Sequence, residues 1–174
     1  FGGFPQELFE VQYPAPGSPP LAARVRELFA PVSVQLDQTW GLDHGTWSVL
    51  AHVFPDANVP VVQLSLDANQ SPRYHYELGT RLAPLRDEGV LIIGSGNVVH
   101  NLGRIQWGED AKPYDWATRF NETVRAHLAA REHQALIDYV SFGETANATS
   151  LSRGPRLDPI GEDARLSVPT PEHY

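Results

Sequence analysis

With 174 residues the chain has the length of one domain, and its 13 basic and 21 acidic residues give a formal net charge of -8. An acidic chain without a basic run is a poor partner for nucleic acid or an anionic membrane, and it has no apolar stretch of the roughly 20 residues that span a bilayer. We therefore expect a soluble, cytoplasmic protein, and its oligomeric state stays open. Because the chain contains no cysteine, histidines and carboxylates are expected to hold any metal.

Helices and short strands alternate through the first half of the sequence. Ser18, which two prolines follow, introduces an amphipathic helix, and Asp43 stands at the start of a second one. Short runs with alternating or concentrated apolar residues predict strands between and after these helices. The expected helices cover residues 21–30 and 44–54, and the expected strands cover residues 32–36 and 61–66.

The next region adds a helix and a third strand. Ser71 caps a helix that extends to about Asp87, and Pro84 is expected to kink or break it. The run 90–94, rich in β-branched residues, then predicts a buried strand. Because strands separated by helices form βαβ units, we expect residues 1–174 to form a single α/β domain, with helices on both faces of a mostly parallel sheet.

A helical region and a loop complete the pattern. The helical region covers residues 115–140 with a break near 130–133, and the stretch 141–168, rich in Gly, Ser, Pro and Asn, is expected to be a long loop. At the end of the chain, Thr170 and Pro171 have the pattern of a helix start. Since the sequence stops there and contains no methionine, we interpret both ends as truncated.

The segment 90–101 is the strongest candidate for a functional site. Its strand leads into a Ser-Gly-Asn turn that contains Asn97 and is followed by His100. Ligands of α/β proteins bind beyond the carboxyl ends of the strands, so His100 is a candidate for chemistry and Asn97 for substrate contact. The alternative is a structural histidine that bonds a loop carbonyl.

Two further histidines occupy positions that suit a site. His44 follows Asp43 between glycines and tryptophans at the mouth of a helix, where a backbone can approach a ligand and aromatic rings can wall a pocket. The alternative there is a helix entry in which Asp43 caps and His44 bonds locally. His173 stands in the first turn of the C-terminal helix, where a metal or substrate ligand can be held rigidly, and the alternative is an exposed chain-end histidine. The other histidines are interpreted as structural: His52, His75, His127 and His133.

Six short motifs occur in a fixed order along the chain. They are FGGFP at 1–5, YPAPG at 13–17, WGLDHG at 40–45, VQLS at 62–65, SGNVVHN at 95–101 and TPEHY at 170–174. In this combination the chain resembles the class III extradiol ring-cleaving dioxygenases, in the branch named for 4,5-DOPA dioxygenase. The resemblance extends from Phe1 to about Val140 and resumes at Pro169.

The resemblance implies a mononuclear non-haem metal enzyme that uses O2 to open the ring of a small catechol, such as DOPA or caffeate, beside its two hydroxyls. Fe(II) is the metal implied, and zinc is possible because some members of the branch hold it. A catechol must lose protons to chelate a metal, and a neutral imidazole can accept and return a proton near the working pH. By resemblance, His100 is an acid/base residue within reach of the metal, His44 is a second histidine that supports catalysis or contacts substrate, and His173 is a metal ligand.

The sequence departs from this family at the first two metal ligands. Those histidines lie in Gly-His-Gly-Ser-Pro and Ala-His-Trp motifs of an N-terminal region, and neither motif occurs in the 174 residues. Taken as the whole polypeptide, the 174 residues are therefore expected to bind metal weakly and to be inactive. Two alternatives stay open: a non-catalytic binding protein of the same fold and a zinc-dependent hydrolase.

Overall fold

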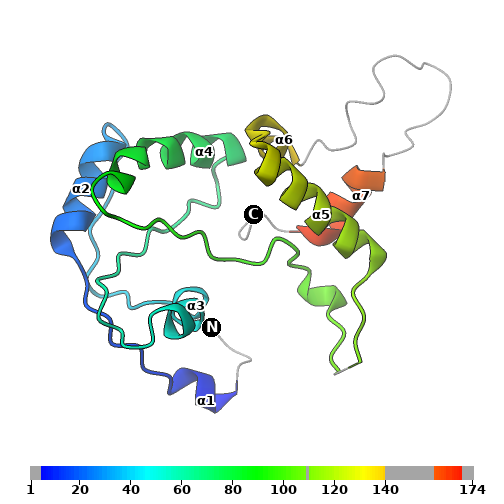
Figure 1. The fold of residues 1–174 in the computed structure, drawn as a ribbon, viewed down its shortest axis with the longest axis horizontal. Helices are drawn as coiled ribbons and strands as arrows, with labels where there is room; N and C mark the ends of the chain where they lie inside the picture. The colour runs from blue at the N-terminus through cyan, green and yellow to red at the C-terminus, as the bar shows by residue number, and fades with distance from the viewer. Residues whose placement is uncertain (1–4, 109, 140–158, 170–174) are drawn as a thin grey trace. The chain divides into compact units, whose positions relative to one another are not determined.

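The computed structural model describes residues 5–108, 110–139 and 159–169, which form helices joined by irregular backbone (Figure 1). They divide into two compact units, the first containing the described residues up to Ser65 together with Leu78–Ser95, and the second containing Leu66–Glu77 and the described residues from Gly96 onward. Along the chain the elements are α1 (Gln6–Phe9), α2 (Pro19–Phe29), α3 (His44–Val53), α4 (Pro72–Arg81), η1 (Ala83–Arg86), η2 (Leu102–Arg104), α5 (Asp115–Ala130), α6 (His133–Ile137) and α7 (Pro159–Ser167).

The predicted parallel sheet is not found in the described residues, so that prediction of the fold class is wrong for this part of the chain. The β-pairing there is limited to one isolated parallel bridge between Gly17 and Val61, in which the Val61 N–H donates to the Pro16 carbonyl at 2.8 Å. The three segments predicted as strands, residues 32–36, 61–66 and 90–94, have irregular backbone instead (Figure 1).

The third predicted strand shows why its sequence pattern was misleading. Leu91, Ile92 and Ile93 are exposed by 68%, 45% and 46%, although their apolar and β-branched side chains favour a strand that is buried. A β-strand also needs a second backbone in register, because its N–H and C=O groups pair only across strands. The described residues pair no such backbone with this segment. The composition of residues 90–94 therefore indicated a local preference for a strand, but it did not show whether a second strand pairs with it.

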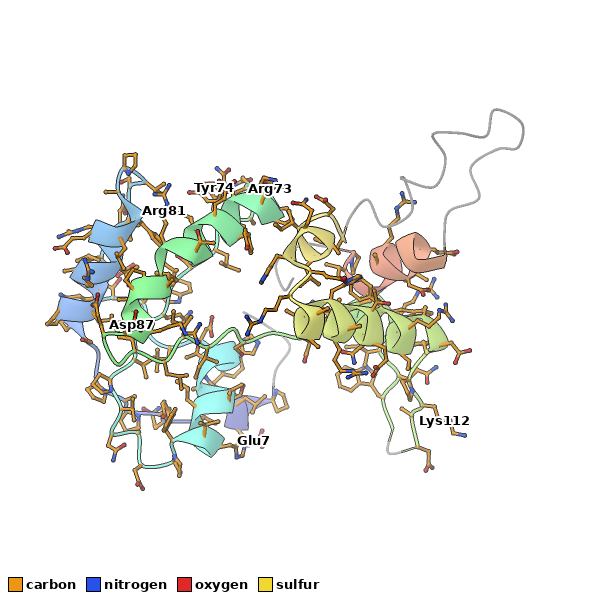
Figure 2. All side chains as sticks on the ribbon, turned by 45° about the horizontal axis from the view of Figure 1, so that its top comes forward. Glu7, Arg73, Tyr74, Arg81, Asp87 and Lys112 are labelled. Carbon is orange, nitrogen blue, oxygen red and sulfur yellow. The ribbon has the colours of Figure 1, made fainter. Side chains whose placement is uncertain are left out.

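The core of the first unit forms around helix α2. Val25, Phe29 and Leu85 are buried there, and further apolar residues pack against them: Leu21, Leu28, Val32, Val34, Leu78, Leu82 and Val90. The Ser18 side chain accepts a hydrogen bond from the Leu21 N–H at the start of α2, which confirms the predicted helix. Arg81, labelled in Figure 2, donates to the carbonyls of Phe29 and Ala30 at 2.8 and 3.1 Å.

Proline and a left-handed residue break the helices where the sequence predicted breaks. Helix α4 ends at Arg81, and Pro84 lies in the short 3₁₀ helix η1 that follows. Helix α5 ends at Ala130 and is followed by Arg131, whose backbone is left-handed with φ of 58°, and α6 begins two residues after Arg131. Both breaks follow from local backbone sterics, because proline cannot continue a helix and a left-handed residue reverses its path.

The core of the second unit joins helices α5 and α7. Phe120, Val124, Tyr139, Ala164 and Val168 are buried in one cluster, against which Val98, Val99 and Leu136 pack. Helix α7 lies within the stretch 141–168 that was expected to be a loop, so that expectation does not hold for residues 159–167. Residues 140–158 and the predicted helix start at 170–174 lie outside the described residues. No helix in the described ranges is both long enough and apolar enough to cross a membrane.

Candidate functional site

The turn that carries His44 opens helix α3 and is held by the preceding residue. The Asp43 Oδ1 atom accepts a hydrogen bond from the Thr46 backbone N–H at 2.9 Å, and the Asp43 carbonyl accepts from the N–H groups of Thr46 and Trp47. An aspartate at this position satisfies donors that the first turn of a helix leaves without intrahelical partners. His44 is therefore the first residue of α3, and its side chain is exposed.

Gln63 closes a ring of hydrogen bonds on the same turn. Its Nε2 atom donates to Asp43 Oδ2 at 2.8 Å, and its Oε1 atom accepts from the Asp43 N–H at 3.1 Å and from Thr46 Oγ1 at 3.0 Å. In addition, Ser95 Oγ donates to the Gly45 carbonyl at 2.6 Å. Gln63 and Ser95, which are distant in sequence from this turn, thus bind the residues on both sides of His44. We call the five residues Asp43, Gly45, Thr46, Gln63 and Ser95 the His44 clamp.

The turn that carries His100 is held in a different way, by the last carbonyls of helix α7. The His100 backbone N–H donates to the Ser167 carbonyl at 2.8 Å, and Asn101 Nδ2 donates to the Leu166 carbonyl at 2.7 Å. These bonds satisfy acceptors that the end of a helix leaves unpaired. The side chain of His100 is half-buried.

An ion pair between an exposed arginine and a buried aspartate joins helix α5 to helix α7. Arg119 donates from Nε and Nη2 to the two carboxylate oxygens of Asp163, each at 2.7 Å. Asp163 is only 2% exposed, so its charge depends on this bidentate partner. Hydrogen bonding to the carboxylate raises the pKa of Arg119 above its usual value. The pair therefore determines where α7 presents its final carbonyls.

The other predicted site residues are distributed over the chain. Asn97 is exposed and belongs with His100 to the second unit, whereas His44 belongs to the first. His173 lies outside the described residues. Within the described ranges no three side chains of the ligating types gather into a metal site. Imidazole nitrogen, the donor that all of the predicted ligands share, is a chemically suitable ligand for both iron and zinc.

Two of the histidines interpreted as structural have contacts of that kind. His75 Nε2 lies 3.0 Å from the Asp67 carbonyl oxygen, and the His75 ring meets the Tyr74 ring edge-on. His127 Nδ1 lies 2.6 Å from a carboxylate oxygen of Glu132, just beyond the end of helix α5. Both contacts are local and tie a helix to an adjacent turn.

Residues 1–148 match the protein family described as the catalytic LigB subunit of aromatic ring-opening dioxygenase. The chain belongs to the LigB family. The matched range contains all five residues of the His44 clamp. It also contains His100 and Asn101 of the second turn. Helix α7, which holds the His100 turn, begins after the matched range ends.

Several proteins described as 4,5-DOPA dioxygenase extradiol align over most or all of the chain. A 4,5-DOPA dioxygenase extradiol of Escherichia coli is 47% identical and aligns with 100% of this chain and 59% of its own length. A protein of the same description from Beta vulgaris is 41% identical over 80% of this chain and 53% of its own. A third, from Portulaca grandiflora, is 34% identical over 100% of this chain and 59% of its own. The chain therefore spans between half and three-fifths of the length of these relatives.

Sequence reasoning identified the two histidine turns of this LigB chain but missed residues that hold them. Gln63 was noted only as part of a motif, and Asp163 fell in a stretch expected to be a loop. One signal for Gln63 was present, because it is a polar residue that follows two valines in a predicted strand. For the Ser167 and Leu166 carbonyls there was none, because every residue has a backbone carbonyl.

Proposed function

We propose that the full-length protein is an extradiol dioxygenase that opens the ring of a small catechol with O2. The observation that carries this proposal is the 47% identity, across the whole chain, with a bacterial protein described as 4,5-DOPA dioxygenase extradiol. The plant relatives share that description, so DOPA is the first substrate to test and caffeate the second. Small aromatic substrates and O2 are the partners proposed.

The proposed enzyme depends on one metal ion, with Fe(II) favoured over zinc. When bound, the metal supplies a site at which a deprotonated catechol chelates and a coordination position stays open to O2. His173 is proposed as one ligand and His100 as a residue within reach of the metal.

His100 is proposed to accept a proton from a catechol hydroxyl and to return it later in the reaction. An imidazole suits this role because its ordinary pKa lies near neutral pH, so it can be neutral when substrate arrives. The backbone hydrogen bond to the Ser167 carbonyl supports the assignment, because an acid/base residue needs a fixed origin for its side chain. His44 and Asn97 are proposed to contact the substrate.

The test is a ring-cleavage assay on the full-length protein loaded with Fe(II), using DOPA and caffeate in air-saturated buffer. We expect a yellow ring-opened semialdehyde and consumption of one O2 for each catechol. If protein with demonstrated bound metal turns over neither catechol, the proposed activity is wrong. Catechol binding without turnover would instead indicate the non-catalytic binding protein.

The role of His100 is tested with His100→Ala in the same assay. We expect turnover to fall by roughly 10²–10⁴-fold, the usual contribution of a general acid/base. The matched control is His52→Ala, which removes an exposed imidazole from helix α3 and is expected to leave turnover unchanged. Equal rates for His100→Ala and the wild-type protein would remove the acid/base assignment.

A further inference from the structure

We propose that Gln63 is a positioning residue that orients His44 toward the substrate, an inference that rests on the proposed function. Gln63 is half-buried and uses both ends of its side-chain amide on the turn that precedes His44. Three of its hydrogen bonds, between 2.8 and 3.1 Å, end on Asp43 or Thr46.

The hydrogen bonds fix which way the Gln63 amide faces. The Asp43 backbone N–H can only donate, so the atom opposite it at 3.1 Å must be the amide oxygen. The amide nitrogen then faces Asp43 Oδ2, a carboxylate oxygen that can accept. A reversed amide would set donor against donor at the first contact and acceptor against acceptor at the second. The arrangement thus admits one orientation, which is expected of a residue that fixes geometry.

The carboxylate of Asp43 transmits the effect of Gln63 to the helix. Its Oδ2 atom is bound to Gln63 and its Oδ1 atom caps the Thr46 N–H. Rotation of the carboxylate away from Gln63 would therefore also break the cap of helix α3. Because His44 stands between these partners as the first residue of α3, the direction in which its side chain leaves the backbone depends on both bonds.

Ser95 supports the turn from its other side. Its hydroxyl donates to the Gly45 carbonyl at 2.6 Å, so the peptide that follows Gly45 is bound, while Gln63 binds the peptide that precedes Asp43. Small errors in the placement of a substrate-contacting group reduce the rate by large factors, about 10²-fold for a shift of 1 Å. The His44 clamp thus has the form expected of support for a functional side chain rather than of general packing.

The first test is Gln63→Leu in the full-length protein loaded with Fe(II). It keeps the approximate size of the side chain but removes all three hydrogen bonds, and we expect kcat/KM for DOPA to fall by roughly 10²-fold. The control is Gln35→Leu, the same change at an exposed position, for which kcat/KM should stay unchanged. An equal loss in both variants, or no loss in Gln63→Leu, would overturn the inference.

A second variant separates positioning from a loss of folding. Gln63→Glu keeps an oxygen for the Asp43 N–H and for Thr46, but it sets a second carboxylate against Asp43 Oδ2. The negative charge of one carboxylate raises the pKa of the other, so a proton binds between them more readily. That proton restores a hydrogen-bond donor between the substituted side chain and Asp43 Oδ2. The ratio of Gln63→Glu activity to wild-type activity is therefore expected to rise as the pH falls toward about 5. A ratio independent of pH would contradict the proposed contact.

A readout without turnover distinguishes this inference from the proposed function. Side-chain NMR of histidine-labelled protein should show a shifted His44 imidazole signal in Gln63→Leu, with the His100 signal unchanged. If wild-type protein cleaves no catechol but the His44 signal still moves, the proposed function fails and the positioning role stands. If wild-type protein is active and the His44 signal does not move, the positioning role fails alone.

Discussion

The two histidine turns are held by different kinds of chemical group. Around His44 most of the partners are side chains, namely the carboxylate of Asp43, the amide of Gln63 and the hydroxyl of Ser95. Around His100 the acceptors are main-chain carbonyls at the end of helix α7. The first turn therefore depends on which residues occupy a few positions, and the second depends on where a helix lies.

This difference predicts how each turn fails. A single polar substitution breaks the His44 clamp directly, as Gln63→Leu does. No substitution at Ser167 or Leu166 removes the carbonyls that accept from the His100 turn, so from the α7 side that turn is disturbed only by moving the helix. On its own side the turn uses the side-chain amide of Asn101 as a donor. Helix α7 is fixed by the apolar cluster around Phe120 and by the pair between Arg119 and Asp163, and substitutions there test the comparison.

The largest effect is expected from Phe120→Ala. Phe120 has no exposed surface and lies at the centre of the cluster that joins α5 to α7. Removal of a buried aromatic ring costs about 3–5 kcal/mol of the free energy of unfolding, because transfer energy is lost and a cavity remains. Urea denaturation of the full-length protein measures the loss, and amide hydrogen exchange should show lower protection at His100.

The control for this change lies on the same helix. Leu128 of α5 is 59% exposed, so Leu128→Ala removes an apolar side chain without opening a cavity and should change stability little. In both variants the Thr46 amide, which is bound by Asp43 in the first unit, should keep its protection against exchange. Equal loss of protection at Thr46 and His100 would show that the two turns do not fail independently.

A smaller effect is expected from Asp163→Asn. The substitution keeps the shape of the side chain but removes the charge and one of the two acceptors that bind Arg119. We expect a loss of stability smaller than that of Phe120→Ala, because the apolar cluster is untouched, with lower exchange protection at His100. The control is Glu162→Gln, which neutralises the adjacent, exposed carboxylate on the same helix. If both variants behave alike, the pair between Arg119 and Asp163 does not set the position of α7.

On the His44 side the cap and the helix were predictable from the sequence, whereas the bonds from Gln63 and Ser95, which are distant in sequence, were not. Asp43 before a helical apolar pattern indicates a cap, and the structure confirms the cap and the helix that follows. Ser18 and Pro84 gave equally local signals, and the helix start and the break are found where they were predicted. Each of these features depends on residues within about one helical turn of one another, so a single sequence contains the information.

The His100 side and the sheet were not predictable in the same way. Helix α7 lies in a stretch with many turn-forming residues, and what stabilises it is its contact with Phe120 and Arg119 more than forty positions earlier. Such contacts override local preference. The predicted strand 90–94 failed for the opposite reason: the local preference was present, but the described residues contain no partner strand for it. Long-range pairing decides both cases, and residue patterns do not encode it.

The smallest effect, and the sharpest test of the comparison, is expected from Ser167→Ala. Ser167 is fully buried, and its Oγ atom has no hydrogen-bond partner among the described residues. Loss of an unpaired buried hydroxyl removes a desolvation cost of about 1–3 kcal/mol, so stability should stay equal or rise slightly. The His100 amide should keep its exchange protection, because its acceptor is the Ser167 carbonyl. With exposed Ser48→Ala as the neutral reference in urea denaturation, a clear destabilisation by Ser167→Ala would mean that α7 also holds the second turn through a side chain, and that its main-chain carbonyls do not act alone.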